Sequence, residues 1–403
     1  MSAARFDLIT NPLAQRGAYP EPARAVVNLA GWRQAQAEIA NWPGYAPSPL
    51  VALPGLARAL GLGRLWYKDE GGRFGLGSFK ALGGAYAVYR LLSDQIERQT
   101  HARPSAAALI AGAHRALAQA ITVTTATDGN HGRSVAWGAR LFGCRSVIYI
   151  HATVSEGRRA AIAAYGAEVV RVAGNYDESV RQAAADAEAK GWHVVSDTSY
   201  GDYRAVPCDV MHGYTVMAGE TADQLEPERP THVLLQGGVG GLAAAVAGHL
   251  WERWGERPRV VAVEPFRADC LYQSAKAGRP TPSTGDLETV MAGLAAGEVS
   301  LAAWDVLAPA VDHFLVIDDD FAIEAMRRLA RPAAGDPAVV GGEAGVGGLA
   351  GLIAVAGDPM ARSTLGLRAD SRVLLVGSEG DTDPETYQRL VGESGDQVRA
   401  GAA

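Results

Sequence analysis

The sequence has few cysteines and no pattern of ligands for a metal ion. Its three cysteines, Cys144, Cys208 and Cys270, are far apart, and no two of them have the spacing of a zinc motif. No two of the nine histidines stand three or four residues apart, so a helical zinc motif is missing as well. We therefore expect no metal site, and we expect reduced thiols in a cytoplasmic protein.

Long apolar runs and an excess of basic residues are also missing. Each apolar stretch is interrupted by Gly, His or a charge well before the roughly 20 residues that span a bilayer. The first residues, Met1 to Leu8, lack the apolar core of a secretion signal. With 37 Lys and Arg against 44 Asp and Glu, the formal charge is −7, which disfavours binding to nucleic-acid phosphates. The sequence therefore predicts neither a membrane nor a nucleic acid as partner.

Glycine, in contrast, is abundant. The chain has 48 glycines in 403 residues, about 12 % where about 7 % is usual. They cluster in Gly71–Gly84, Gly237–Gly241 and Gly341–Gly351. Clusters of this kind suit turns in which the backbone approaches a ligand closely.

Strand-like and helix-like segments alternate along most of the chain. The expected strands are Ile121–Thr125, Ser146–Ile150, Glu168–Val172, His193–Ser196, His232–Leu235, Arg259–Glu264, His313–Ile317 and Arg372–Val376. This alternation predicts an α/β fold with two open, twisted parallel-sheet domains and helices on both faces. We also expect a helix within Arg98–Gln119 and a wrapping arm from Asn11 to Pro54. Ligands of such sheets bind beyond the carboxyl ends of the strands.

The first motif is Gly75-Leu-Gly-Ser-Phe-Lys80, followed by an amphipathic helix over Ala81–Arg98. Lys80 would then stand at a helix N-terminus, where the positive end of the macrodipole disfavours a structural lysine. The same field would lower the pKa of the amine and make it nucleophilic. A surface lysine that happens to begin a helix is the alternative.

The second motif, Gly237-Gly-Val-Gly-Gly241, lies between an expected strand and the expected helix Leu242–Trp254. A glycine turn that leads into a helix N-terminus binds phosphate through backbone N–H groups. The spacing fits neither a Walker motif nor a dinucleotide fingerprint, so the phosphate of a small cofactor is the better interpretation. A tight turn without a ligand is the alternative.

Three more polar turns follow expected strands. They are Thr125–Gly132, Ser196–Tyr200 and Gly377–Asp383. In the first, Asp128 or Asn130 could simply cap the next helix. The last could be no more than an acidic turn.

Together these motifs resemble the fold-type II pyridoxal-phosphate enzymes, such as threonine and serine dehydratases. Four blocks are similar, more specifically, to the diaminopropionate ammonia-lyase family: Arg73–Tyr86, Ala126–Gly132, Met291–Leu294 and Ser378–Asp383. The resemblance extends from roughly Tyr45 to Val391. In Gly342-Glu-Ala-Gly345, Ala344 stands where the family usually has Ser.

The resemblance implies a role for each matching residue. Lys80 would bind the aldehyde of pyridoxal 5'-phosphate as a Schiff base, Asn130 would bind the ring hydroxyl, and Ser378 would face the ring nitrogen. The phosphate would be held by Gly237, Gly238, Val239, Gly240 and Gly241. Asp128 and Asp197 would abstract the α-proton. We expect a large domain of residues 1–85 and 206–403, a smaller inserted α/β domain of residues 86–205, and the cofactor in the cleft between them.

The resemblance also implies the reaction. It is the α,β-elimination of ammonia from 2,3-diaminopropionate, which gives pyruvate and ammonia, in a cytoplasmic homodimer that acts on a small amino acid. The alternatives are a related lyase or dehydratase acting on serine, threonine or another β-substituted amino acid, and a binding protein that kept the fold without catalysis.

Overall fold

The computed structural model describes residues 4–127 and 129–401, and the chain divides into two compact units. The large unit comprises Met1–Leu29, Pro47–Gly72 and Met217–Ala403, and the small unit comprises Ala30–Ala46 and Arg73–Val216. The helices α2 (Leu29–Ile39) and α10 (Ala205–Leu225) have residues in both units. The domain limits that we expect from the sequence stay a prediction.

The large unit is built on a seven-stranded sheet in the order β1-β10-β9-β8-β11-β3-β2. Its five inner strands are parallel, and the edge strands β1 and β2 pair antiparallel to their neighbours. The strands are β1 (Phe6–Thr10), β2 (Leu50–Ala52), β3 (Arg64–Asp69), β8 (His232–Gln236), β9 (Arg259–Pro265), β10 (His313–Ile317) and β11 (Arg372–Gly377). The buried strands β8 and β10 have no exposed residue, as expected for a sheet covered on both faces.

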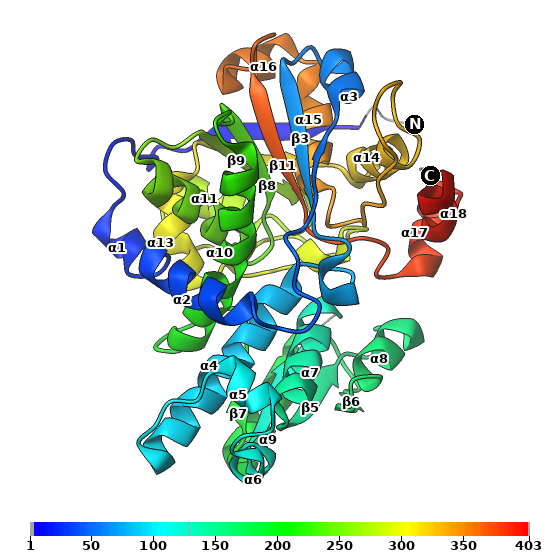
Figure 1. The fold of residues 1–403 in the computed structure, drawn as a ribbon. Coiled ribbons are helices and arrows are strands. Elements are labelled where there is room, and N and C mark those ends of the chain that lie inside the picture. The colour runs from blue at the N-terminus through cyan, green and yellow to red at the C-terminus, as the bar shows by residue number, and fades with distance from the viewer. Residues whose placement is uncertain (1–3, 128, 402–403) are drawn as a thin grey trace. The chain divides into compact units, whose positions relative to one another are not determined.

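Helices cover both faces of this sheet, with α11 and α13 on one side and α14 and α15 on the other (Figure 1). The helices of the large unit are α1 (Glu21–Arg24), α3 (Pro54–Ala59), α11 (Gly241–Trp254), α12 (Cys270–Ala277), α13 (Leu301–Ala310), α14 (Asp319–Ala330), α15 (Gly347–Ala356), α16 (Pro359–Leu365), α17 (Pro384–Val391) and α18 (Gly395–Gly401). Helix α15 packs on the sheet so closely that a Cβ on Gly348 would lie 2.5 Å from the carbonyl oxygen of Leu234. Glycine is therefore required there by packing.

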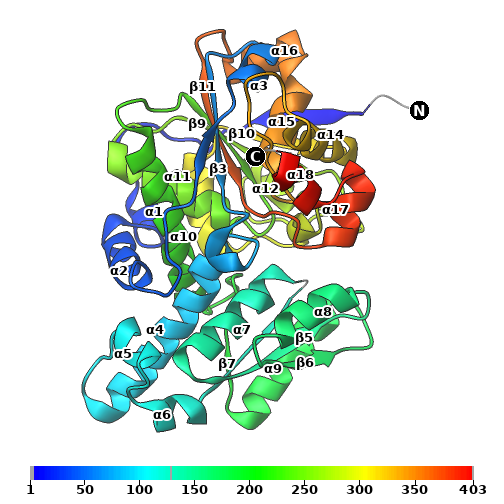
Figure 2. The same cartoon turned by 45° about the vertical axis from the view of Figure 1, so that its right-hand side comes forward.

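The small unit has a four-stranded, fully parallel sheet in the order β6-β5-β4-β7. The strands are β4 (Thr122–Ala126), β5 (Arg145–Ile150), β6 (Glu168–Arg171) and β7 (His193–Val194), and the helices are α4 (Lys80–Thr100), α5 (Ala106–Ile110), α6 (Arg115–Ala120), α7 (Asn130–Phe142), α8 (Glu156–Ala163) and α9 (Tyr176–Lys190). Helices α4 and α7 lie side by side (Figure 2). A Cβ on Gly138 would be 2.7 Å from Cα of Ala85, so a glycine permits this approach.

The expected α/β fold class is confirmed, and each strand expected from the sequence is present with small shifts at its ends. The helix expected within Arg98–Gln119 is present as two short helices, α5 and α6, separated by a turn with Gly112 at φ +89°. The sequence missed β1, β2, β3 and α10. The strand β1 pairs with β10 some 300 residues away, and no local pattern reveals such a partner.

Candidate active site

Lys80 is the first residue of α4, as predicted, and its amine lies 2.5 Å from Oδ2 of Asp197. Both side chains are largely buried, with 20 % and 15 % of their surface exposed. Burial by itself lowers the pKa of Lys80, but the negative charge of Asp197 and the contact with Tyr214 outweigh it, so the pKa is raised. The expected lowering by the helix N-terminus is therefore wrong, since a carboxylate in contact acts more strongly than a partial charge of the backbone.

The turn before Lys80 is stabilised by aromatic packing. Phe74 has a left-handed backbone with φ +51°, and Gly75 and Gly77 follow at +70° and +76°. The ring of Phe74 packs 5.0 Å from that of Trp137 on α7, between ring centroids, and 5.9 Å from that of Trp42. Contacts of this size offset the cost of about 1–3 kcal/mol for a non-glycine residue in this conformation.

Asp197 stands just after β7, and its pKa is held well below the usual range. Burial alone would raise this pKa, but the positive charge of Lys80 and its hydrogen bond to the carboxylate lower it. Thr198 also donates to Oδ1 of Asp197 at 3.4 Å. The carboxylate is therefore ionised beside the amine.

His131 completes this group from the first turn of α7. Its Nε2 lies 2.8 Å from the carbonyl oxygen of Val195, and a carbonyl only accepts, so Nε2 carries the hydrogen. This leaves the lone pair of Nδ1 on the side of Asp197, 3.7 Å from Oδ2. Burial lowers the pKa of His131, which keeps the ring neutral. The sequence motif contained His131, but no role for it followed from the pattern.

Tyr214 on α10 is a second residue that the sequence did not reveal. It is fully buried, and its ring lies 4.5 Å from the ring of Phe79 and 5.9 Å from the Lys80 amine. Burial raises its pKa, so the phenol stays protonated. The segment that contains it carried no motif, and only the tertiary structure brings it to Lys80.

Asn130 begins α7 directly after β4, as the motif predicted. The N-cap of this helix is Gly129, and Oγ1 of Thr127 accepts from the N–H groups of Gly129 and Gly132 at 3.0 Å each. Asn130 is therefore the first residue of the helix and not its cap. Asp128 lies outside the described residues, and its predicted role stays a prediction.

The glycine loop joins β8 to α11 and presents unbonded amides. Gly238 and Gly240 have positive φ angles of +67° and +98°. The N–H of Gly237 donates to Val263 at 2.8 Å, whereas among the described residues the N–H groups of Gly238 to Gly241 find no acceptor. Such amides at the N-terminus of a 14-residue helix fit a phosphate group. The unbonded amides belong to residues 238–241, and a Cβ on Gly237 would lie 2.6 Å from Cγ of Glu264. The predicted phosphate site over Gly237 to Gly241 stays a prediction.

Glu264 is a buried acid beneath this loop at the end of β9. Its two oxygens accept from the amides of Leu271 and Tyr272 at 3.0 and 2.8 Å. Burial outweighs these bonds and raises its pKa to about 8. The sequence placed Glu264 at the end of a strand but could not reveal that it is largely protonated at neutral pH.

Ser378 follows β11, and its hydroxyl is oriented by Gln236. The amide nitrogen of Gln236 donates to Oγ of Ser378 at 2.7 Å and to the carbonyl oxygen of Val376 at 3.0 Å. Two acceptors at one end of the amide fix which end is nitrogen. Oγ of Ser378 therefore accepts from Gln236, and its own hydrogen is left to donate elsewhere. Gln236 is a positioning residue that the sequence did not identify.

The glycines near residue 342 pack against the acidic turn. The N–H of Gly342 donates to the carbonyl of Glu379 at 2.9 Å, and the N–H of Ala344 donates to its carboxylate at 3.0 Å. A Cβ on Gly345 would lie 2.5 Å from the carbonyl oxygen of Glu379. Close packing thus explains this glycine cluster, and Ala344 contributes a backbone contact to it.

Two absences hold for the described residues. No three or more His, Cys, Asp or Glu side chains among them are placed to hold a metal ion. None of the helices over residues 4–127 and 129–401 is both long and apolar enough to cross a membrane. The three cysteines are free thiols.

Comparison with known proteins gives a consistent answer. Residues 42–378 match the family described as pyridoxal-phosphate dependent enzyme. The diaminopropionate ammonia-lyase of Escherichia coli (strain K12) is 38 % identical over 373 residues, which cover 89 % of this chain and 92 % of the relative. The crystal structure of the holo form of an Escherichia coli diaminopropionate ammonia-lyase is similar with a TM-score of 0.88 and 35 % identity, over 96 % of this chain and 97 % of the other.

A crystal structure of the Escherichia coli lyase in complex with D-serine is equally similar. Its TM-score is 0.88 at 35 % identity, and the match covers 98 % of this chain and 99 % of the other. Sequence and structure thus agree over nearly the full length of both proteins. The chain therefore belongs to the pyridoxal-phosphate-dependent enzymes and, within them, to the diaminopropionate ammonia-lyase family.

Proposed function

We propose that this chain is a pyridoxal-phosphate-dependent lyase that eliminates ammonia from 2,3-diaminopropionate. The observation that carries the proposal is the contact of 2.5 Å between the buried Lys80 amine and the Asp197 carboxylate. This pair offers an amine for the cofactor aldehyde and a base for the α-proton. The relatives named above support the substrate, since they are diaminopropionate ammonia-lyases along nearly their whole length.

The residues present fit the cofactor. Lys80 would bind the aldehyde, Asn130 the ring hydroxyl, and the amides of residues 238–241 the phosphate. The unbonded amides and the positive φ of Gly238 and Gly240 are the observations that support a phosphate there. The Ser378 hydroxyl, left as a donor by Gln236, suits the ring nitrogen. When bound, pyridoxal phosphate supplies an electron sink for the carbon that loses its proton.

The residues around Lys80 would move the proton. With Lys80 holding the cofactor, Asp197 would no longer face a free ammonium group and would be available as a base. Nδ1 of His131, 3.7 Å away with its lone pair on that side, can accept a hydrogen bond from the protonated Asp197. The neutral Ser378 hydroxyl would donate a hydrogen bond to the ring nitrogen without protonating it, which would favour loss of a β-substituent over transamination.

The amine leaving group of diaminopropionate explains why carboxylates are needed in the proposed site. An amine departs far more easily from its protonated form, and carboxylates such as Asp197 keep it protonated and attract a cationic substrate. The product of elimination is aminoacrylate, which water converts into pyruvate and a second ammonia. One diaminopropionate and one water thus give one pyruvate and two ammonia.

A second candidate function is elimination from a hydroxy amino acid. The complex of an Escherichia coli relative with D-serine favours this activity as a side reaction. A catalytically inactive binding protein is disfavoured, because the Lys80–Asp197 pair has the burial and contact of a reactive site. We also propose a cytoplasmic homodimer, in line with the family resemblance and the three free thiols.

The experiment combines a spectrum with a product assay. The purified protein should be yellow with pyridoxal phosphate and release pyruvate from diaminopropionate faster than from serine or threonine. Lys80→Ala should lose both the visible absorbance band and the activity. Lys190→Ala, a control on the exposed end of α9, should keep both. A protein that stays colourless with added cofactor contradicts the proposal, and a faster release from serine favours the second candidate.

A further inference from the structure

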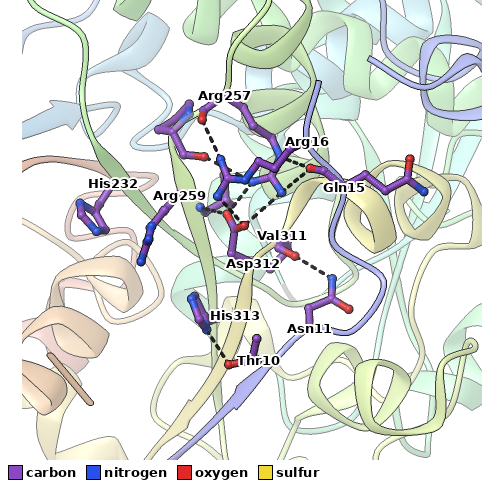
Figure 3. A network of polar contacts seen from close by, with 12 residues as sticks. Thr10, Asn11, Gln15, Arg16, His232, Arg257, Arg259, Val311, Asp312 and His313 are labelled. Carbon is purple, nitrogen blue, oxygen red and sulfur yellow. Dashed lines mark hydrogen bonds and ion pairs between the residues drawn. The ribbon is translucent and has the colours of Figure 1, made fainter. Parts of the chain in front are cut away.

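A surface cavity of about 420 Å³ lies at the amino-terminal ends of β8 and β9 in the large unit. Figure 3 shows the polar network on its inner side. The lining residues are Arg16, Arg229, Pro230, Thr231, Trp254, Glu256, Arg257, Pro258 and Arg259. Four arginines in one cavity are unusual for a chain with a formal charge of −7. The glycine loop follows the other end of β8, so the cavity is separate from the candidate active site.

Two of the four arginines are accounted for by the fold. Arg257 is buried, lies against both oxygens of Asp312 and donates to the carbonyl oxygen of Gln15 at 2.7 Å. Arg16 lies 2.6 Å from the same carboxylate of Asp312 and donates to the carbonyl of Arg257 (Figure 3). One carboxylate therefore serves two guanidinium groups, and these arginines fasten the N-terminal segment to the sheet.

The other two arginines have no such explanation. Arg229 is exposed, and its guanidinium stacks 5.4 Å from the ring centroid of Trp254. Arg259 is exposed, and its one side-chain hydrogen bond within residues 4–127 and 129–401 goes to the carbonyl of Leu365 at 2.9 Å. In the part of the chain that the structure describes, neither side chain has an anionic partner. Even with the exposed Glu256 counted, the cavity keeps a positive excess.

Trp254 lines the same cavity. Trp254 is 91 % buried, and its indole N–H has no acceptor among the described residues. This nitrogen is covered by the protein, so Trp254 contributes its ring, on which Arg229 stacks, and no hydrogen bond to a ligand. His232 and His313 in the adjoining polar network add no positive charge, because burial lowers their pKa values and keeps them neutral.

We propose that this cavity binds a small metabolite through a phosphate group. The planar guanidinium groups of Arg229 and Arg259 offer both positive charge and directed donors, which phosphate oxygens require. The volume exceeds that of inorganic phosphate, so the phosphate is carried by a larger organic group, a phosphomonoester. This site goes beyond the lyase reaction and uses none of its residues.

The test uses the holoenzyme, in which the cofactor occupies its own phosphate site. Binding of inorganic phosphate and of pyrophosphate is measured by calorimetry at constant ionic strength, with chloride as the reference anion. Both phosphates should bind, and Arg229→Gln and Arg259→Gln should each weaken binding about tenfold, as expected for the loss of one charge-assisted contact. The cofactor spectrum should stay unchanged in both variants.

Arg279→Gln is the matched control, since Arg279 is exposed on the large unit away from the cavity. This variant should bind phosphate like the unmodified chain. Equal binding in all variants, or heats no larger than those of chloride, would overturn the proposal. Loss of binding in the control as well would show a general charge effect and would overturn it too.

Discussion

Asp197→Asn is the sharpest test of the proposed chemistry, because it removes one charge and leaves the shape of the side chain. A general base contributes about 10²–10⁴-fold to a rate, which corresponds to about 2.7–5.4 kcal/mol of barrier. We expect kcat/KM for the L-enantiomer of diaminopropionate to fall within that range and that for the D-enantiomer to fall less. The family resemblance assigns the D-enantiomer mainly to Asp128.

The residues beside Asp197 are poor replacements for it. Apart from Lys80, which would hold the cofactor, the base next to Asp197 among the described residues is His131, and its lowered pKa makes it a weak one. Its Nε2 is bound to a carbonyl, so the ring cannot turn to serve as a second acceptor without losing that bond. We therefore expect the full fall in kcat/KM of about 10²–10⁴-fold that the loss of one general base causes.

The same variant has a readout that does not depend on activity. In the unmodified chain, Asp197 raises the pKa of Lys80 and keeps the amine protonated. Without that charge, burial dominates and lowers the pKa, and only the neutral amine attacks an aldehyde. The cofactor-free variant should therefore take up pyridoxal phosphate at a lower pH than the unmodified chain does.

The assay follows pyruvate release from each enantiomer, with cofactor content measured in the same samples. Asp177→Asn, an exposed position in the first turn of α9, is the control and should have normal kinetics. Equal losses for both enantiomers would refute the assignment of separate bases and indicate a shared role in substrate binding. Unchanged rates would refute a catalytic role for Asp197 altogether.

Two further predictions concern the glycine loop and the acid beneath it. Gly238→Asp should lose pyridoxal phosphate on dialysis, whereas Gly238→Asn should keep more of it. Both side chains fit the space and tolerate φ +67°, but only the carboxylate repels a phosphate. Equal retention of the cofactor by the two variants would contradict a phosphate site in the glycine loop. Glu264, with a pKa of about 8 in the fold and an ordinary value of 4.5, contributes stability below about pH 4.5 that is lost as the pH rises to about 8. From about pH 5.5 to 7.5, the free energy of unfolding of Glu264→Gln, measured in urea, should therefore rise relative to that of the unmodified chain by at most about 2.7 kcal/mol. A difference between the two that is independent of pH would show that Glu264 stays ionised.

Local patterns were sufficient for much of the fold and for several site residues. The alternation of short buried strands with helices predicted the α/β class and the strand positions, because side-chain periodicity depends only on neighbouring residues. Lys80 at the start of a helix and the glycine loop between β8 and α11 followed from the same local reasoning. Their proposed roles came from the resemblance to a family, and they stay predictions to be tested.

Contacts between distant segments were beyond the sequence. Gln236 and Ser378 are 142 residues apart, yet one orients the hydroxyl of the other. Tyr214 lies on α10, a helix that no sequence motif predicted. The edge strands β1 and β2 form only by pairing with strands elsewhere in the chain. In these cases the informative neighbour is close in space only.

The sequence by itself determined the order of the elements, the glycine turns and the positions of the polar residues at the ends of the strands, since each of these depends on a short stretch of backbone. Only the tertiary structure decided how those residues are charged. Lys80 and Asp197 are 117 residues apart, and their contact raises the pKa of one and lowers that of the other, opposite to what the helix N-terminus alone predicted for Lys80. Glu264 likewise is protonated because folding removes water from it. Protonation depends on burial and on neighbouring charges, and both exist only once the chain is folded.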